Sequence, residues 1–384
     1  MIKSATTGTG AALERLFITG VSPVTMDDVT SGFNIGTNIT NDSWFNDLVG
    51  FSENELREML EYYKEQGVLQ ESIDEIVAMM KPNYDNYCFS EDTLEQCMFN
   101  SDMALYFLKS FVLHHKKPKE IVDPNIRTDF NKLAYLIKLD HGLGENFSVI
   151  KEIAEQGEII TDIVTHFSAL EMTDPSNFKS LLFYFGLLSI KGVDMVGRPI
   201  LHVPNLVVRE QLFNFLIQGY IKHDIFKIDM NKMSALFENM AFRGDWKPLF
   251  DFIANAVREQ SRIREYIEGE AHIKGFLLAY LGMYRYYQLY PEYELNKGFA
   301  DFFFKPSLSV PVLPPFTYLL EVKYAKAGAS EKEIRILADE ARGQLLRYSE
   351  DELVAEARAK GELKLITIVW RSWELVLLEE VTLS

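Results

Sequence analysis

Residues 298–301 read Gly-Phe-Ala-Asp, and residues 318–323 read Tyr-Leu-Leu-Glu-Val-Lys within an apolar run. The second segment is typical of a buried β-strand, in which residues two apart lie on the same face, so Glu321 and Lys323 point the same way. Burying a carboxylate and an ammonium on so apolar a strand is unfavourable unless another charge compensates them. A divalent cation bound by Asp301 and Glu321 would provide that charge, and Lys323 could then orient or acidify a water molecule bound to it.

An amphipathic helix is predicted directly after this strand. Between Glu331 and Arg347, apolar side chains recur at spacings of three and four residues, which is typical of a helix that packs one face on a sheet. Gln344 lies beside the apolar face, and Glu270 falls in another predicted helix upstream. The predicted order from residue 262 onward is helix, three strands, helix and strand, which indicates an α/β domain.

This pattern resembles the PD-(D/E)XK nuclease superfamily, whose signature is an Asp, a spacer and then Glu-x-Lys on the next strand. Asp301 matches the first acid, Glu321-Val322-Lys323 matches the second half, and Gln344 matches a Gln that many members carry on the following helix. The resemblance implies that residues 262–384 form a restriction-endonuclease-like domain, with a mixed central sheet flanked by helices. It also implies hydrolysis of phosphodiester bonds in nucleic acid, with DNA the favoured substrate.

The same resemblance implies roles for individual residues. Mg2+ (or Mn2+) would be held in hard oxygen coordination by four residues, namely Asp301, Glu321, Val322 through its carbonyl, and Glu270. Lys323 would position and activate the attacking water or neutralise the charge that develops on the phosphoryl group, and Gln344 would help to hold the water or the substrate. The predicted catalytic residues are therefore Asp301, Glu321, Lys323 and Gln344.

A purely structural interpretation of the same residues stays open. Glu321 and Lys323 could be neighbours on the solvent face of an edge strand, and a three-residue motif arises easily by chance in a chain with 25% charged residues. On the three motif residues alone, the two interpretations are evenly matched. The presence of Gln344, Glu270 and the glycine turn before Asp301 favours the nuclease.

The formal net charge of −17 argues against a general nucleic-acid-binding surface, because phosphate contacts need Lys and Arg. The charge is unevenly distributed along the chain. Residues 262–384 contain 16 Lys and Arg against 19 Asp and Glu, whereas the whole chain contains 39 against 56. The acidity therefore lies mainly before residue 262, and metal-binding carboxylates would account for part of the remainder.

The length of 384 residues allows two or three domains, and the hydrophobic content of 47% is that of an ordinary soluble protein. No apolar run approaches the roughly 18 residues that span a bilayer, and no charged-then-apolar leader begins the chain, so we expect a cytoplasmic protein with no membrane partner. The two cysteines, Cys88 and Cys97, are too few for a disulfide framework or a four-ligand zinc site and are expected to be reduced.

A second resemblance lies near the N-terminus. Residues 15–39, which begin Arg-Leu-Phe-Ile-Thr-Gly, and residues 51–60 are similar to the later part of a predicted AAA-ATPase-like family that is commonly fused to a C-terminal PD-(D/E)XK domain. The P-loop of an ATPase needs Gly-Lys-Ser/Thr to hold phosphates, yet the chain contains no Gly-Lys dipeptide. We therefore expect an N-terminally incomplete member with no ATP site and no ATPase activity of its own.

These resemblances predict four regions in an α/β protein whose N-terminal and middle parts are mostly helical. They are a remnant of the ATPase-like core (1–50) with a strand at Leu16–Val21, a helical lid (51–116) opened by a capping box at Ser52 and Glu55, a helical connecting region (117–261), and the nuclease-like domain (262–384). The connecting region contains predicted helices at 131–139, 177–190, 207–220 and 231–260.

The extended segments 186–192 and 198–204 follow the helix predicted at 177–190, which is the outline of a winged helix. Few basic residues lie in the candidate wing, so a structural or nucleotide-sensing role is favoured over DNA contact. Two other functions stay open for the whole chain. One is a non-catalytic DNA-binding or scaffold protein that keeps the nuclease fold, and the other is a partner of an intact ATPase, or of another copy, that completes the Leu16–Val21 strand.

Overall fold

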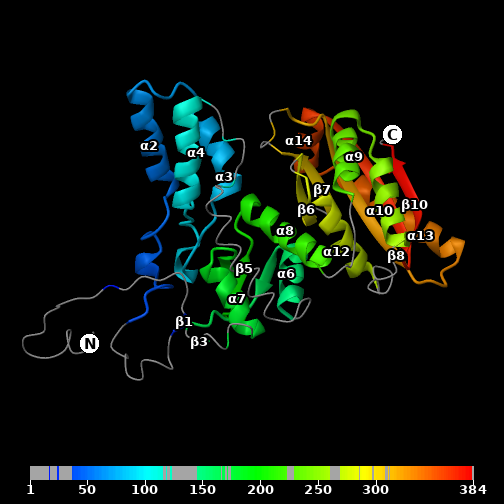
Figure 1. Ribbon diagram of the computed structural model, residues 1–384, viewed down its shortest axis with the longest axis horizontal. Helices are drawn as coiled ribbons and strands as arrows, with labels where there is room; N and C mark the ends of the chain where they lie inside the picture. The colour runs from blue at the N-terminus through cyan, green and yellow to red at the C-terminus, as the bar shows by residue number, and fades with distance from the viewer. Residues whose placement is uncertain are drawn as a thin grey trace, which may run out of the picture. The chain divides into compact units, whose positions relative to one another are not determined.

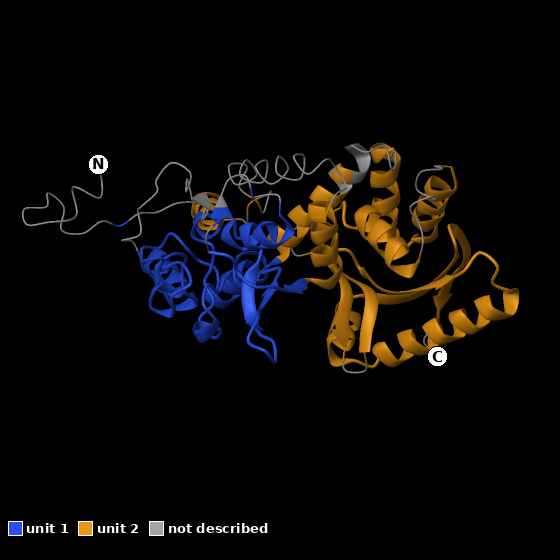
Figure 2. Cartoon of the chain, turned by 90° about the horizontal axis from the view of Figure 1, so that it is seen from below, with its two compact units in different colours: residues 1–105, 135–141, 158–205 blue, residues 106–134, 142–157, 206–384 orange. Residues whose placement is uncertain are grey.

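The chain divides into two compact units, coloured blue and orange in Figure 2. Unit 1 comprises residues 1–105, 135–141 and 158–205, and unit 2 comprises residues 106–134, 142–157 and 206–384. The structure is a computed structural model that describes these residues: 17, 24–25, 37–115, 118, 122, 145–165, 167–168, 171, 174–222, 229–259, 269–284, 286–295, 298–307, 310 and 312–382. Two predicted elements lie outside the described residues, namely the helix at 131–139 and, apart from Phe17, the strand at Leu16–Val21.

The helices of unit 1 confirm the helical pattern after residue 51. Helix α2 begins at a capping box in which Ser52 and Glu55 bond reciprocally, and Gly67 follows its end with a φ of +70°. The boundary between the two units falls within α4. The helical elements as far as this boundary are η1 (Ser43–Phe45), α2 (Glu53–Glu65), α3 (Ile73–Tyr84), η2 (Glu91–Thr93) and α4 (Ser101–His114).

Two small sheets complete the described part of unit 1. The strands β2 (Glu158–Ile160), β5 (Pro199–His202) and β4 (Ser189–Val193) form one antiparallel sheet in that order, and β1 (Val24–Thr25) pairs in parallel with β3 (Phe167–Ser168). The predicted hairpin is therefore present. Helix α7 (Pro175–Tyr184) ends before the predicted residue 190, because Gly186 adopts a left-handed φ of +70° and turns the chain into β4.

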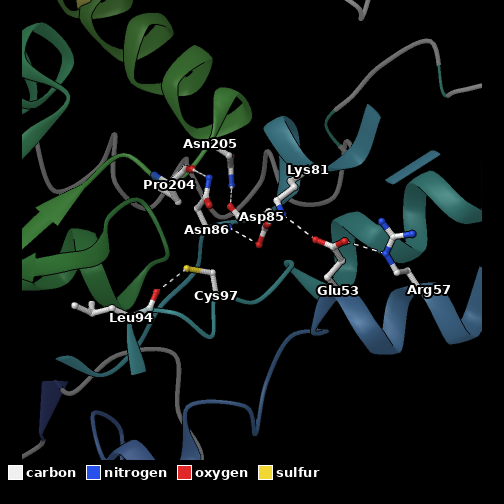
Figure 3. A network of polar contacts seen from close by, with 9 residues as sticks. All are labelled: Glu53, Arg57, Lys81, Asp85, Asn86, Leu94, Cys97, Pro204 and Asn205. Atoms are coloured by element: carbon white, nitrogen blue, oxygen red, sulfur yellow. Dashed lines mark hydrogen bonds and ion pairs between the residues drawn. The ribbon is translucent and has the colours of Figure 1, made fainter. Parts of the chain in front are cut away.

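A polar network ties the loop after α3 to the end of β5 within unit 1 (Figure 3). Asn86 has a φ of +73°, which asparagine tolerates better than most residues, and its side-chain amide donates to the Pro204 carbonyl at 3.0 Å. The Asn205 amide donates to the Asp85 carbonyl at 3.1 Å. Glu53 accepts hydrogen bonds from Lys81 and from another basic side chain on α2, so the network also joins α2 to α3.

Unit 2 is built on a five-stranded mixed sheet in the order β10-β9-β8-β7-β6. Neighbouring strands are antiparallel except for β8 and β9, which are parallel. The parallel connection runs through α13 (Glu331–Tyr348) and α14 (Glu352–Lys360). The strands are β6 (Tyr287–Leu295), β7 (Gly298–Pro306), β8 (Phe316–Ala325), β9 (Glu362–Arg371) and β10 (Glu374–Val381).

Helices cover the sheet, so this part of the chain has the predicted α/β architecture with the predicted order of helix, three strands, helix and strand (Figure 1). Strand β10 is an addition to that order. Helix α13 contacts β7, β8, β9 and β10, whereas α9 and α12 contact β8 and α10 contacts β10. The helices before the sheet are α6 (Glu145–Gln156), α8 (Leu206–Lys222), α9 (Met230–Arg243), α10 (Lys247–Glu259) and α12 (Glu270–Leu281).

The apolar stripe of α13 packs on the sheet as its spacing predicts. Ile334 and Leu345 are buried in two clusters that also contain Leu319 of β8 and Val369 of β9. Burial of each such side chain contributes about 1.5–3 kcal/mol. The helix expected over 231–260 is instead two helices, α9 and α10, because Gly244 ends α9 with a φ of +69°.

No helix within the described ranges combines the length and the apolar character that a membrane crossing requires.

Candidate functional site

Asp301 and Glu321 meet where the ladder between β7 and β8 ends. The last register pair at this end of the two strands is Phe302 with Leu320. Asp301 and Glu321 are the residues directly beyond that pair. The backbone N–H of Val322 donates to Asp301 Oδ2 at 2.6 Å. The carboxylate of Asp301 is therefore fixed against the backbone of the strand that carries Glu321.

Glu321 is one of the most deeply buried charged residues of unit 2, with 1% of its surface exposed. Its Oε1 accepts a hydrogen bond from Lys323 Nζ at 2.8 Å, which places both side chains on one face as the strand alternation predicts. Its Oε2 is buried with no hydrogen-bond partner in the described part of the chain. Burial and the nearby charge of Asp301 raise the pKa of Glu321 to about 7.

Lys323 is half-buried and remains charged. Burial lowers its pKa, but the hydrogen bond to Glu321 and the negative charge of that carboxylate outweigh burial and raise the pKa above its ordinary value. The ammonium is thus held beside the unpartnered carboxylate oxygen. The interpretation of Glu321 and Lys323 as a solvent-exposed pair on an edge strand is wrong, because β8 lies between β7 and β9 and Glu321 is buried.

Lys274 of α12 is a charged residue of the site that the sequence did not single out. Its Nζ lies 2.5 Å from Asp301 Oδ1, 3.0 Å from Glu292 Oε1 and 3.1 Å from Glu270 Oε1. Burial lowers the pKa of Lys274, but the charge of Asp301 and the hydrogen bond to it raise the pKa well above its ordinary value. Burial raises the pKa of Asp301, and Lys274 opposes that shift.

Gln344 and Tyr348 come from α13. Gln344 Nε2 lies 3.5 Å from Tyr348 Oη, one helical turn further along. Burial raises the pKa of Tyr348, and the charge of Glu321 raises it further, so the tyrosine lies within electrostatic reach of that carboxylate. Gln344 therefore borders the site through the tyrosine, and no direct hydrogen bond from it to either acid is recorded among the described residues.

Thr367 of β9 is a second residue that sequence analysis missed. It is the parallel register partner of Glu321, which places the two side chains on the same face of adjacent strands. Thr367 is 2% exposed, and its Oγ1 has no hydrogen-bond partner in the described part of the structure. A polar residue inside the apolar run of 365–370 was the available signal.

Glu270 begins α12 after the N-cap Gly269 and points its carboxylate at Lys274. Among the described residues, no three His, Cys, Asp or Glu side chains converge in an arrangement that could hold a metal ion. The two carboxylates at the end of the β7–β8 ladder nevertheless suit a hard divalent cation, because both are oxygen donors and one buried oxygen has no partner. The roles of Glu270 and of the Val322 carbonyl as further ligands stay a prediction.

A cavity of about 630 Å3 adjoins Asp301. Its charged lining consists of Glu155 of α6, Glu270, Lys274, Glu292 and Asp301, and its apolar lining includes Phe299. Glu155 has a pKa raised by burial to about 7. Acidic groups from two helices and two strands therefore converge on the space beside the acid pair.

The C-terminal part of unit 2 is thus an α/β domain whose mixed sheet carries a buried Asp, a buried Glu and an adjacent Lys where β7 and β8 separate. Residues 268–380 match the family model described as the PD-(D/E)XK nuclease superfamily, so the C-terminal part of the chain is a domain of that superfamily. A search of curated proteins found no match to the chain. Neither comparison supports the resemblance of the N-terminal part to AAA-ATPase-like proteins.

Proposed function

We propose that the C-terminal domain is a divalent-metal-dependent nuclease that hydrolyses phosphodiester bonds of nucleic acid, with DNA as the first substrate to test. The observation that carries the proposal is the buried Glu321 Oε2, which has no hydrogen-bond partner among the described residues and lies beside Asp301 and Lys323. A carboxylate oxygen buried without a partner is destabilising by about 1–3 kcal/mol. Such a cost is typical of a functional group whose partner binds from outside the chain.

Asp301 and Glu321 would hold Mg2+ or Mn2+, with Glu270 and the Val322 carbonyl as further candidate ligands. The bound cation would supply a Lewis acid that stabilises negative charge on the phosphate and lowers the pKa of water. The residues of the chain have separate tasks. The Val322 N–H orients the Asp301 carboxylate, and the Lys323 ammonium orients the Glu321 carboxylate.

Lys323 supplies a fixed positive charge in this proposal. Its ammonium donates to Glu321 Oε1 and is close enough to the unpartnered oxygen to donate to a water molecule or a phosphate oxygen next to it. Because its pKa is raised, Lys323 remains protonated at neutral pH and would act by electrostatic stabilisation and positioning. Gln344 would hold the substrate or the water from α13, in contact with Tyr348.

A non-catalytic binding or scaffold role is the second candidate, and one observation favours it. Lys274 already gives Asp301 a positive partner at 2.5 Å, so the acid pair is partly neutralised by the chain itself. Partnership with an intact ATPase, self-association and an ATPase-like origin of residues 1–50 stay proposals. They rest on the sequence alone, since the predicted strand at Leu16–Val21, apart from Phe17, is outside the described residues.

Cleavage assays separate the two candidates. Supercoiled plasmid, double-stranded and single-stranded DNA, and RNA oligonucleotides are incubated with the full chain in Mg2+, in Mn2+ and in EDTA. The nuclease proposal expects products in metal alone and their loss in Glu321→Ala. Equal amounts of product in EDTA and in metal would favour the non-catalytic role. Binding of DNA without cleavage of any substrate would favour it as well.

A further inference from the structure

The ammonium of Lys274 is surrounded by carboxylates. Three of them lie within 3.1 Å of Nζ, contributed by the first turn of α12, by β6 and by β7. The side chain of Lys274 is 19% exposed and that of Asp301 is 4% exposed. The spacing of four residues between Glu270 and Lys274 explains one of these contacts as a helix pair, but not the contacts to the two strands.

The contact with Asp301 occupies the oxygen that a metal ion would need. Asp301 Oδ2 already accepts the Val322 N–H at 2.6 Å, so Oδ1 is the oxygen left for an external ligand. Lys274 lies on Oδ1. A divalent cation and an ammonium at the same carboxylate oxygen repel each other strongly in a buried site, because the effective dielectric constant there is low.

The cavity beside Asp301 offers the ammonium another position. Lys274 lines this space of about 630 Å3 together with Glu292 and Glu155. Glu155 Oε1 is buried with no hydrogen-bond partner in the described structure and lies 3.8 Å from Lys151 Nζ. A flexible lysine side chain can therefore leave Asp301 and keep carboxylate partners within the same cavity.

We propose that Lys274 is a built-in competitor of the divalent cation. Its ammonium holds Asp301 Oδ1 in the metal-free protein, and when metal binds it leaves Asp301, keeps its contact with Glu292 and moves toward Glu155. This inference rests on the proposed metal-dependent function of the same site. Lys274 is a positioning residue here, since it acts through Asp301. It would lower the metal affinity of the site and keep the acid pair charge-balanced without metal.

Isothermal titration of Mn2+ into the full chain tests the competition. Lys274→Met removes the ammonium but keeps a side chain of similar length, and Lys274→Arg keeps the charge. We expect Lys274→Met to bind Mn2+ at least tenfold more tightly than wild type and Lys274→Arg to stay within about threefold. Equal or weaker binding by Lys274→Met would overturn the inference.

A second measurement uses the wild-type chain, so it does not depend on folding of a variant. Acetylation of lysines by an amine-reactive ester, read by mass spectrometry, reports how accessible each ammonium is. The reactivity of Lys274 should change at least threefold on addition of saturating Mg2+. Lys364 is the internal control, because it is 13% exposed and pairs with Glu362 and Glu380 on the same sheet. No change at Lys274 in the metal-bound protein would contradict the inference.

The outcomes separate this inference from the proposed function. Metal-dependent cleavage by wild type, together with unchanged Mn2+ affinity in Lys274→Met, overturns the role of Lys274 and leaves the nuclease standing. Mn2+ binding by Lys274→Met without binding by wild type supports the role of Lys274 and overturns nuclease activity in the natural chain. Absence of binding in both overturns both.

Discussion

Replacing Glu321 with Gln should stabilise the metal-free protein while removing its affinity for a divalent cation. The amide keeps an oxygen that can accept from Lys323, but it carries no charge beside Asp301. In wild type, Glu321 is 1% exposed, and its second oxygen has no hydrogen-bond partner in the described structure. A buried carboxylate with an unpartnered oxygen lowers the free energy of unfolding. This is expected of a residue that binds a metal ion and not of a structural ion pair.

The magnitude follows from the two oxygens of Glu321. Removal of the charge buried at the unpartnered oxygen is worth about 1–3 kcal/mol, and weakening of the charge-assisted bond to Lys323 offsets about half of that. We therefore expect the free energy of unfolding to rise by about 1 kcal/mol in EDTA at pH 8. Adding Mg2+ should stabilise wild type and leave the variant unchanged.

Urea unfolding followed by tryptophan emission measures this difference. Three of the four tryptophans, Trp246, Trp370 and Trp373, lie in unit 2, so the emission reports mainly on the unit that carries the site. Glu362→Gln is the matched control, because Glu362 pairs with Lys364 on the same sheet but is 61% exposed. The free energy of unfolding of this control should differ from that of wild type by less than about 1 kcal/mol. A fall of more than about 1 kcal/mol in the free energy of unfolding of Glu321→Gln would instead show that Glu321 is a structural partner of Lys323.

Three further variants test other parts of the site and its support. Lys323→Met should lower the rate of cleavage at least about a hundredfold, while the affinity for Mn2+ measured by titration changes little. Loss of both the cleavage and the Mn2+ affinity would assign Lys323 to metal binding. Gly298→Ala should lower the free energy of unfolding by about 1–3 kcal/mol. Gly298 has a φ of +139°, and a Cβ there would lie 2.9 Å from Tyr348 Oη. An unchanged urea midpoint would contradict this prediction. Burial raises the pKa of Glu155 from 4.5 to about 7, so the folded state favours the protonated acid and stability falls by up to about 3 kcal/mol between pH 4.5 and 7. Glu155→Gln should flatten that decline, and an identical pH profile in both proteins would show that Glu155 does not cause it.

The strand and helix of the site could be predicted because their signals are local. An apolar run with alternating charges specifies β8 and puts Glu321 and Lys323 on one face, as the 2.8 Å bond between them confirms. Apolar spacings of three and four specify α13, which the structure begins with a capping box at Ser330. Local patterns were sufficient because α13 buries one face against the sheet, and because the side chains of β8 alternate between the two faces of the sheet.

Lys274 and Thr367 could not be predicted because their importance depends on contacts between distant segments. In sequence, Lys274 forms an ordinary helix pair with Glu270, and only the packing of α12 brings it to Asp301 on β7. Thr367 becomes a neighbour of Glu321 through the parallel register of β8 and β9. No local sequence pattern around either residue predicts that register. Sequence patterns also joined α9 and α10 into one helix, since the break depends on the left-handed conformation of a single residue, Gly244.

Titration of Mg2+ and Mn2+ into wild type and Asp301→Asn, with cleavage assays on the same samples, tests the central claim most directly. The amide can still accept the 2.6 Å hydrogen bond from Val322, so the fold should persist while the charge that binds metal is lost. Glu379→Gln is the control, because that residue is 51% exposed and pairs with Arg342. We predict that wild type and the control bind metal and cleave nucleic acid, whereas Asp301→Asn does neither. Metal-dependent cleavage by Asp301→Asn at the wild-type rate, or a wild type that neither binds metal nor cleaves, would contradict it.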